Sequence, residues 1–137
     1  MYYGDILSDL DISELVAHHN AKGAALTLVL SNRYSLPVGV ADVEGGLVKS
    51  FREKPSLGLN VTTGCMVIRN DAIHLLDDVR AKSSKRDLMS HFVPKVLEAG
   101  QRVAAYYFSG FWYDVGTTEA YEKLENKLID KQLNFLG

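Results

Sequence analysis

Apolar segments of two different periods alternate along most of this chain of 137 residues, and this alternation limits the possible folds more than any other feature. Short runs rich in β-forming residues predict five strands, at residues 24–30, 37–43, 47–51, 61–68 and 103–108. Segments with apolar residues at helical spacing lie between them, beginning at Asp11, Asn70, Asp87 and either Thr117 or Thr118. The pattern predicts an α/β fold with a mixed, mainly parallel sheet flanked by helices.

Local punctuation supports this division. Asp11-Ile12-Ser13-Glu14 has the pattern of a capping box, and Gly23 is placed to end the helix that follows. Its expected buried stripe consists of Ile12, Leu15, Val16 and His19. Glu44-Gly45-Gly46 predicts a hairpin turn, and Pro94 predicts a kink in the helix that begins at Asp87.

Composition excludes several functional classes. The length fits one domain, and the net charge of −2 gives no general attraction to nucleic acid or to an anionic membrane surface. Apolar runs such as residues 24–30 are too short to span a bilayer. The single Cys65 excludes an internal disulfide, and a reducing, cytoplasmic location is the simplest expectation.

Two carboxylates stand beside expected strands. Asp5 follows Tyr3-Gly4, and Asp114 ends the aromatic run Phe111-Trp112-Tyr113. Binding sites in open α/β sheets lie at the carboxyl ends of strands, so two such carboxylates meeting there would suit Mg²⁺. Each aspartate has a second interpretation as an ordinary turn or N-cap residue, and the sequence alone leaves this open.

Three further motifs have a functional and a plain interpretation. Glu53 and Lys54 precede Pro55, and in an extended segment their side chains would face opposite ways. Lys54 could then bind a phosphate and Glu53 could bind hydroxyls. The alternative is a solvated charged turn. Gly39, within an expected strand, marks either close approach of a ligand or a bulge, and the same holds for Gly64 in Thr62-Thr63-Gly64.

Other common catalytic patterns are missing. The four histidines fall on separate expected helices or face different ways on one helix, so they predict no metal set. The chain contains no Walker A motif, no dinucleotide-binding glycine motif and no nucleophile elbow.

The order of the motifs resembles that of the sugar-1-phosphate nucleotidyltransferases, the NDP-sugar pyrophosphorylases. The chain has Gly4-Asp5 before a capped helix, followed in order by Val38-Gly39-Val40, Glu53-Lys54-Pro55, Thr62-Thr63-Gly64 and Trp112-Tyr113-Asp114-Val115-Gly116-Thr117. The resemblance implies the second half of a Rossmann-like nucleotide-diphospho-sugar transferase domain. It also implies an enzyme of the mannose-1-phosphate guanylyltransferase or glucose-1-phosphate thymidylyltransferase kind, which joins a nucleoside triphosphate to a sugar 1-phosphate and releases pyrophosphate.

The same resemblance implies roles for individual residues. Asp5 and Asp114 would hold the catalytic Mg²⁺, and Lys54 would bind the phosphate of the sugar. Glu53 would bind sugar hydroxyls. The sugar pocket would be lined by Gly39, by the backbone near Thr63 and Gly64, and by Trp112.

The family's catalytic domain opens with a glycine-rich segment that binds the nucleotide, and no such segment occurs in this sequence. We therefore expect residues 1–137 to form a single partial domain that is inactive alone and that forms a homo-oligomer or binds a complementing N-terminal half. The alternative is a non-catalytic module for sugar-phosphate binding, oligomerisation or regulation.

Overall fold

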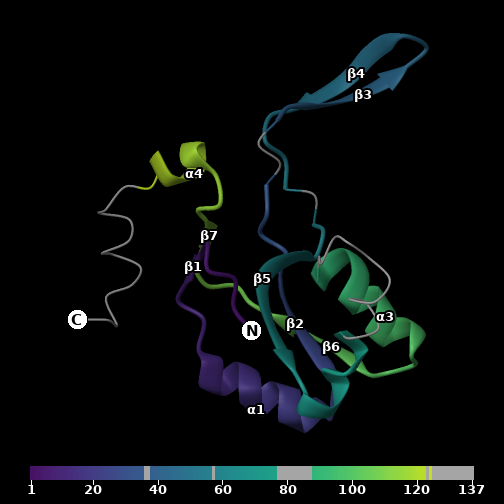
Figure 1. Cartoon of the computed structure of the whole chain (residues 1–137). Helices are drawn as coiled ribbons and strands as arrows, with labels where there is room; N and C mark the ends of the chain where they lie inside the picture. Colours follow the sequence, from purple (N-terminus) through teal and green to yellow (C-terminus); the bar gives the residue numbers. More distant parts are fainter. Residues whose placement is uncertain (36–37, 57, 77–87, 123, 125–137) are drawn as a thin grey trace.

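The computed structural model describes residues 1–35, 38–56, 58–76, 88–122 and 124, and its strands form three small sheets (Figure 1). The central sheet has the order β5-β2-β6, in which β2 (Leu26–Ser31) lies between β5 (Val61–Ile68) and β6 (Val103–Tyr107). A ribbon pairs β1 (Ile6–Ser8) with β7 (Trp112–Asp114), and a hairpin pairs β3 (Val40–Glu44) with β4 (Leu47–Arg52).

The mixed α/β class is confirmed, but parallel pairing is less extensive than expected. Strand β2 runs parallel to β6 and antiparallel to β5, while β1–β7 and β3–β4 are both antiparallel. For the hairpin the reason is the short turn, which forces β3 and β4 to run in opposite directions. The pair β1–β7 joins segments from the two ends of the described chain.

The first helix begins and ends where the sequence predicts. Helix α1 (Ile12–Lys22) is capped by Asp11, whose carboxylate accepts hydrogen bonds from the N–H groups of Ser13 and Glu14 at 2.7 and 3.0 Å. Gly23 ends it in the left-handed conformation, with φ of 53°. Only half of the expected stripe is buried: Leu15 and His19 face the sheet, whereas Ile12 and Val16 are exposed. A short helix covering one sheet contacts it along a narrower strip than helical periodicity alone indicates.

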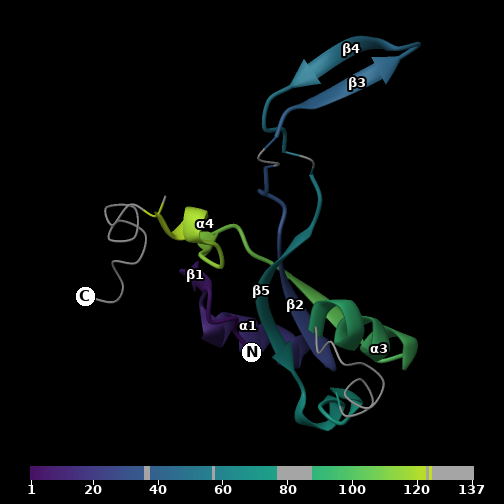
Figure 2. The ribbon, with the colours of Figure 1, turned by 45° about the horizontal axis from the view of Figure 1, so that its top comes forward.

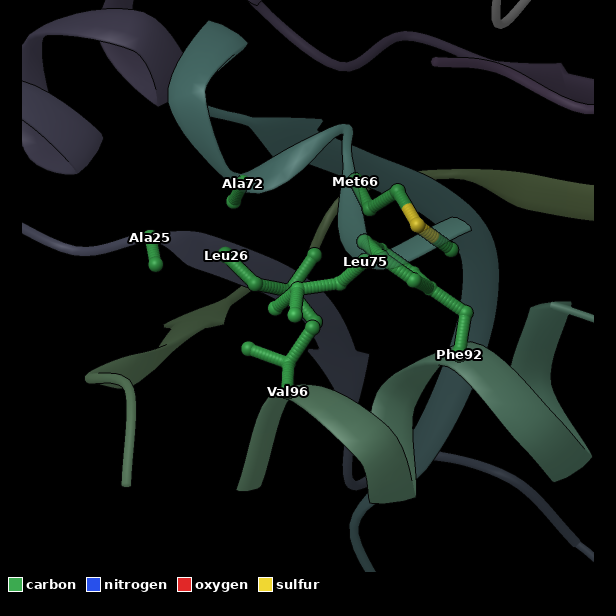
Figure 3. Packing of buried hydrophobic residues seen from close by; sticks show 7 residues of the cluster. All are labelled: Ala25, Leu26, Met66, Ala72, Leu75, Phe92 and Val96. Carbon is green, nitrogen blue, oxygen red and sulfur yellow. The ribbon is translucent and has the colours of Figure 1, made fainter. Parts of the chain in front are cut away.

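The two faces of the central sheet pack against different partners. On one face Met66 and Leu26 pack against Val96 of α3 (Val93–Glu98) and against Phe92, the residue just before α3. Figure 3 shows these side chains meeting. On the other face Val29 and Cys65 join Leu15 of α1, together with Ile6 and Leu10 from the segment around β1. Neighbouring residues such as Cys65 and Met66 belong to opposite clusters because strand side chains alternate.

The segment between β5 and β6 departs from the expected pair of helices. Its described part begins with a 3₁₀ turn at Asn70–Ala72, and the expected continuation through Val79, with the polar loop 81–85, lies outside the described residues. A π-helical turn, Leu88–Phe92, leads into α3, and Pro94 lies in the first turn of α3. Proline lacks the N–H that would continue the hydrogen bonds of the preceding turn, and the π-helical geometry of Leu88–Phe92 stands directly before it.

The hairpin stands away from the rest of the molecule, as Figures 1 and 2 show. Its turn uses Gly45 and Gly46 with φ of 57° and 79°, as the glycine pair predicts. Cross-strand pairing places Ala41 with Phe51 and Val43 with Val48 on one face, because a bulge at Lys49 shifts the register. This apolar hairpin face is exposed, with Val43, Val48 and Phe51 each more than 60% accessible.

The last helix, α4 (Thr118–Glu122), is capped by Thr117, whose hydroxyl oxygen accepts a hydrogen bond from the Ala120 N–H at 3.1 Å. The expected apolar residues Leu128 and Ile129 lie outside the described residues. Within the part of the chain that the structure describes, no helix combines the length and the apolar character that spanning a bilayer requires.

A buried histidine makes the stability of the fold depend on pH. His19 Nδ1 lies 2.8 Å from Thr27 Oγ1 in the interior. Burial lowers the pKa of His19 below its ordinary value of 6.5, and Arg69 and His18 lower it further. Between pH 7.5 and 5.5 the unfolded chain therefore gains a proton at His19 before the folded protein does. The stabilisation from neutral His19 is present above pH ~6.5 and is lost as the pH falls below it.

We expect urea unfolding midpoints to fall over this pH interval for the native chain. His19→Asn, which keeps a polar group near Thr27, should be less stable throughout but show a flatter pH dependence. His74→Asn is the matched control at an exposed position and should keep the native slope. Equal slopes for His19→Asn and the native chain would contradict the assignment.

Candidate functional site

The ribbon of β1 and β7 brings the two candidate metal ligands together. Ile6 pairs with Asp114 in the ribbon, and the Val115 N–H donates to the Asp5 carbonyl oxygen at 2.8 Å. The expected placement of both aspartates at carboxyl ends of strands is correct for Asp114, which ends β7, but wrong for Asp5. Asp5 lies in a turn between a bridge at Tyr2 and the start of β1. Because β1 and β7 are antiparallel, the start of one meets the end of the other.

Gly116 shows how close the carboxylates are. A Cβ atom on this glycine would lie 2.9 Å from Asp114 Oδ1 and 2.9 Å from Asp5 Oδ2, so the two oxygens are separated by no more than twice that distance. The Gly116 N–H donates to Asp114 Oδ1 at 2.8 Å and orients that carboxylate. Glycine at this position leaves open the space that both carboxylates face.

The donor set of this carboxylate pair fits a hard divalent cation. Two exposed carboxylates this close repel each other, and a bound cation would relieve that repulsion. Among the described residues, no cluster of three or more His, Cys, Asp and Glu side chains is placed to hold a metal ion. Mg²⁺ commonly takes only one or two protein carboxylates and fills its other positions with water and substrate phosphate oxygens. The pair therefore suits Mg²⁺ shared with a substrate better than a closed structural metal site.

Neighbouring contacts hold β7 in place. The Asp9 carboxylate accepts a hydrogen bond from the Phe111 N–H at 2.8 Å, and the Arg33 guanidinium donates to the Ser109 carbonyl oxygen at 2.8 Å. These bonds fix both sides of the loop that enters β7, just before Trp112.

The base of the hairpin brings Gly39 and Glu53 together. A Cβ atom on Gly39 would lie 3.0 Å from Glu53 Oε2 and would also collide with the Phe51 ring. The expected position of Gly39 inside a strand is wrong, because β3 begins at Val40; the glycine allows the Phe51 and Glu53 side chains to approach its backbone closely. A carboxylate and an aromatic ring side by side over bare backbone can offer a sugar hydrogen-bond acceptors and an apolar surface.

Lys54 differs from the expected extended conformation. Strand β4 ends at Arg52, and Lys54 has a positive φ of 45°, the left-handed region that costs a non-glycine residue free energy. The expected alternation of Glu53 and Lys54 about an extended chain therefore does not apply. The chain turns at Lys54, whose side chain is exposed, and then enters the buried Pro55.

Thr63 and Gly64 support the N-terminal segment. The buried Thr63 hydroxyl donates to the Val29 carbonyl oxygen at 3.3 Å, and the Gly64 carbonyl oxygen accepts from the Tyr3 N–H at 3.2 Å. Gly64 has a φ of 78° at an irregularity of the β2–β5 pairing, and a Cβ there would lie 3.0 Å from Ile6 Cγ1. These contacts hold Tyr3 and Ile6 on either side of Asp5, and the expected contact with sugar stays a prediction.

Trp112 has an aromatic neighbour that the sequence analysis missed. The ring of Tyr34, which follows β2, stacks on Trp112 with centroids 6.4 Å apart and planes inclined by 27°. The only sequence signal for Tyr34 was its position beyond the carboxyl end of an expected strand, where ligand sites gather. Gly116 is a second residue of the candidate site that the motifs did not predict, although an Asp two residues before it favours the turn observed here.

The space at Gly116 yields a direct test. Gly116→Ala should push the two carboxylates apart and weaken binding of Mg²⁺ or Mn²⁺ by about tenfold or more, a change typical of disturbed metal-ligand geometry. Calorimetry measures the affinity, and circular dichroism checks the fold. Gly4→Ala is the matched control, since a Cβ on Gly4 meets nothing within 4 Å. Unchanged cation affinity in Gly116→Ala would show that the carboxylate pair is not the metal site.

Comparison with known proteins supports the family that the motifs resemble. The family model described as nucleotidyl transferase matches residues 2–131. The chain is 32% identical over 139 residues to the glucose-1-phosphate adenylyltransferase of Fervidobacterium nodosum, covering 92% of this chain and 32% of the relative. It is 29% identical over 134 residues to a protein of Sulfolobus acidocaldarius named as a mannose-1-phosphate guanyltransferase, covering 93% and 34%.

A solved structure gives the same fold. A Bacillus anthracis protein named as a glucose-1-phosphate thymidylyltransferase, in complex with sucrose, matches with a TM-score of 0.57 and 20% identity over 89% of this chain and 50% of that one. The chain spans about a third of the length of the curated relatives. The match to the family model over nearly the whole chain shows that it belongs to the nucleotidyl transferase family, among the sugar-1-phosphate nucleotidyltransferases.

Proposed function

We propose that this chain supplies the sugar-phosphate and metal-binding half of a site that joins a nucleoside triphosphate to a sugar 1-phosphate and releases pyrophosphate. One observation carries the proposal: the carboxylates of Asp5 and Asp114, from distant parts of the chain, converge on the space beside Gly116. A pair of this kind, open to solvent and lacking further ligands among the described residues, suits a cation that is shared with phosphate.

The proposed chemistry needs charge neutralisation and positioning rather than a covalent catalyst. A phosphate oxygen of the sugar 1-phosphate attacks the α-phosphorus of the triphosphate; the new P–O bond forms as the bond to pyrophosphate breaks. Asp5 and Asp114 would hold Mg²⁺, which when bound neutralises phosphate charge. The Lys54 ammonium would bind and orient the sugar phosphate.

Sugar recognition is proposed for the base of the hairpin. The Glu53 carboxylate would accept hydrogen bonds from sugar hydroxyls, beside the bare backbone of Gly39. The Trp112 ring would form a wall of the pocket, with the backbone near Thr63 and Gly64 contributing the floor.

We further propose that residues 1–137 act as a single partial domain, in a homo-oligomer or with a complementing nucleotide-binding segment, and do not turn over substrate alone. The proposal is supported by the share of its relatives that the chain spans, about a third. Steady release of pyrophosphate from any pairing of nucleoside triphosphate and sugar 1-phosphate by the purified chain would overturn it.

A second candidate function is a non-catalytic module for sugar-phosphate binding, oligomerisation or regulation. The exposed apolar hairpin face favours it, because contiguous apolar surface on a soluble protein marks interaction sites. Light scattering together with titration separates the two functions. An oligomer that binds no Mg²⁺ would favour the module, whereas sugar-phosphate binding that depends on Mg²⁺, in any oligomeric state, would favour the enzyme half.

The metal role of Asp114 is tested by titrating the chain with glucose 1-phosphate and mannose 1-phosphate, with and without Mg²⁺. Asp114→Asn keeps an oxygen for the Gly116 N–H but removes the charge. We expect Mg²⁺ to strengthen binding to the native chain and to have no effect on the variant. Asp71→Asn, which removes an exposed carboxylate elsewhere, is the control and should behave as the native chain. A variant that still responds to Mg²⁺ would exclude Asp114 as a ligand.

The phosphate role of Lys54 is tested by Lys54→Asn. Asparagine tolerates the left-handed conformation, so the unfolding midpoint should change little, while sugar 1-phosphate affinity should fall about tenfold or more with the loss of a charge-assisted hydrogen bond. Lys49→Asn, an exposed lysine on β4, is the control. Native affinity in Lys54→Asn would remove Lys54 from the proposed site.

A further inference from the structure

The proposed site is divided between two parts of the molecule. Gly39, Glu53 and Lys54 lie at the base of the hairpin, whereas Asp5 and Asp114 lie at one end of the ribbon of β1 and β7, Asp5 in the turn just before β1. Figures 1 and 2 show the hairpin reaching away from the central sheet on two legs of chain. If one substrate phosphate is to contact both parts, something must hold the legs in a fixed relation to the ribbon.

Tyr34 lies on the first leg and contacts the ribbon directly. Its ring stacks on Trp112 of β7, with centroids 6.4 Å apart. The next residue, Ser35, forms a β-bridge with Ser56 on the second leg, two residues after Lys54. A short path thus leads from Trp112 through Tyr34 to the segment that carries Lys54.

The Trp112 end of this path leads to the metal pair. Trp112 and Asp114 are two residues apart on β7 and therefore share a face of the ribbon, while the Tyr113 hydroxyl donates to the Ala120 carbonyl oxygen at 3.0 Å. Pairing of Trp112 with Ser8 fixes this strand against β1. A shift of the Trp112 ring would thus alter the position of the strand that carries Asp114.

The Tyr34 end is held from the central sheet. The Arg33 N–H donates to the Ser31 hydroxyl oxygen at 3.3 Å, and the Arg33 guanidinium donates to the Ser109 carbonyl oxygen. Tyr34 itself is 43% exposed and belongs to neither buried cluster. The Tyr34 ring can therefore orient its neighbours, while the stability of the core does not depend on it.

We propose that Tyr34 is a positioning residue: by stacking on Trp112 it sets the hairpin base against the carboxylate pair, so that a divalent cation and a sugar 1-phosphate bind cooperatively. This inference rests on the proposed function and adds a coupling between its two halves. The alternative is a surface stack that leaves ligand binding unaffected.

The first arm of the test needs no ligand, because Trp112 is the only tryptophan in the chain. Removal of the Tyr34 ring in Tyr34→Ala should expose the indole and shift its fluorescence emission to longer wavelength, with the unfolding midpoint little changed. Tyr34→Phe keeps the ring and should retain the native spectrum. Tyr107→Ala, another exposed tyrosine, is the matched control. Identical emission from Tyr34→Ala and the native chain would overturn the inference.

The second arm measures coupling by titrating glucose 1-phosphate and mannose 1-phosphate with and without Mg²⁺. In the native chain, Tyr34→Phe and Tyr107→Ala, Mg²⁺ should raise the affinity for at least one sugar phosphate by the same factor. In Tyr34→Ala that factor should shrink by about two- to tenfold, the range expected for one aromatic pair.

The outcomes separate the two proposals. Cooperative binding in the native chain that persists unchanged in Tyr34→Ala would overturn the role of Tyr34 and leave the proposed function intact. Absence of Mg²⁺-dependent binding in the native chain would overturn both. Lost coupling in Tyr34→Ala, with coupling restored in Tyr34→Phe, would support the positioning role over a merely structural one.

Discussion

The antiparallel pairing of β1 with β7 is the contact on which the candidate site depends. It joins segments from opposite ends of the described chain, sets Ile6 against Asp114, and so brings Asp5 beside Asp114. Each strand contributes only three residues, so the ribbon needs support from elsewhere. That support comes from the packing of Ile6 in the cluster with Leu15 and Val29, and from the hydrogen bond of Asp9 to the loop before β7.

The packed core and the proposed ligand contacts occupy different parts of this molecule. The central sheet is packed on both faces, by α1 on one side and by α3 with its π-helical turn on the other. The proposed ligand contacts lie on the ribbon and at the hairpin base, where side chains are mostly exposed. Substitutions at Lys54, Gly116 or Tyr34 are therefore informative, because they change the site without opening a cavity in the core.

Local features were well predicted from the sequence because their causes are local. Asp11 and Gly23 cap α1 through contacts within a few residues, and Gly45-Gly46 forms the hairpin turn because both positions need positive φ. Thr117 caps α4 in the same way. The family was also recognisable from the sequence, since the order of short motifs survives without knowledge of their contacts, and the match over residues 2–131 agrees with it.

The sequence by itself determined the α/β class, the element borders near caps and turns, and the residue types available for a site. Only the tertiary structure decided that Asp5 and Asp114 meet at Gly116, that Thr63 is turned inward, and that Tyr34 stacks on Trp112. It also decided the exposure of Ile12 and Val16 on α1. The physical reason is that periodicity and capping report interactions within one turn or one strand. Contacts between distant segments depend on how sheets pair and how far each helix overlaps them.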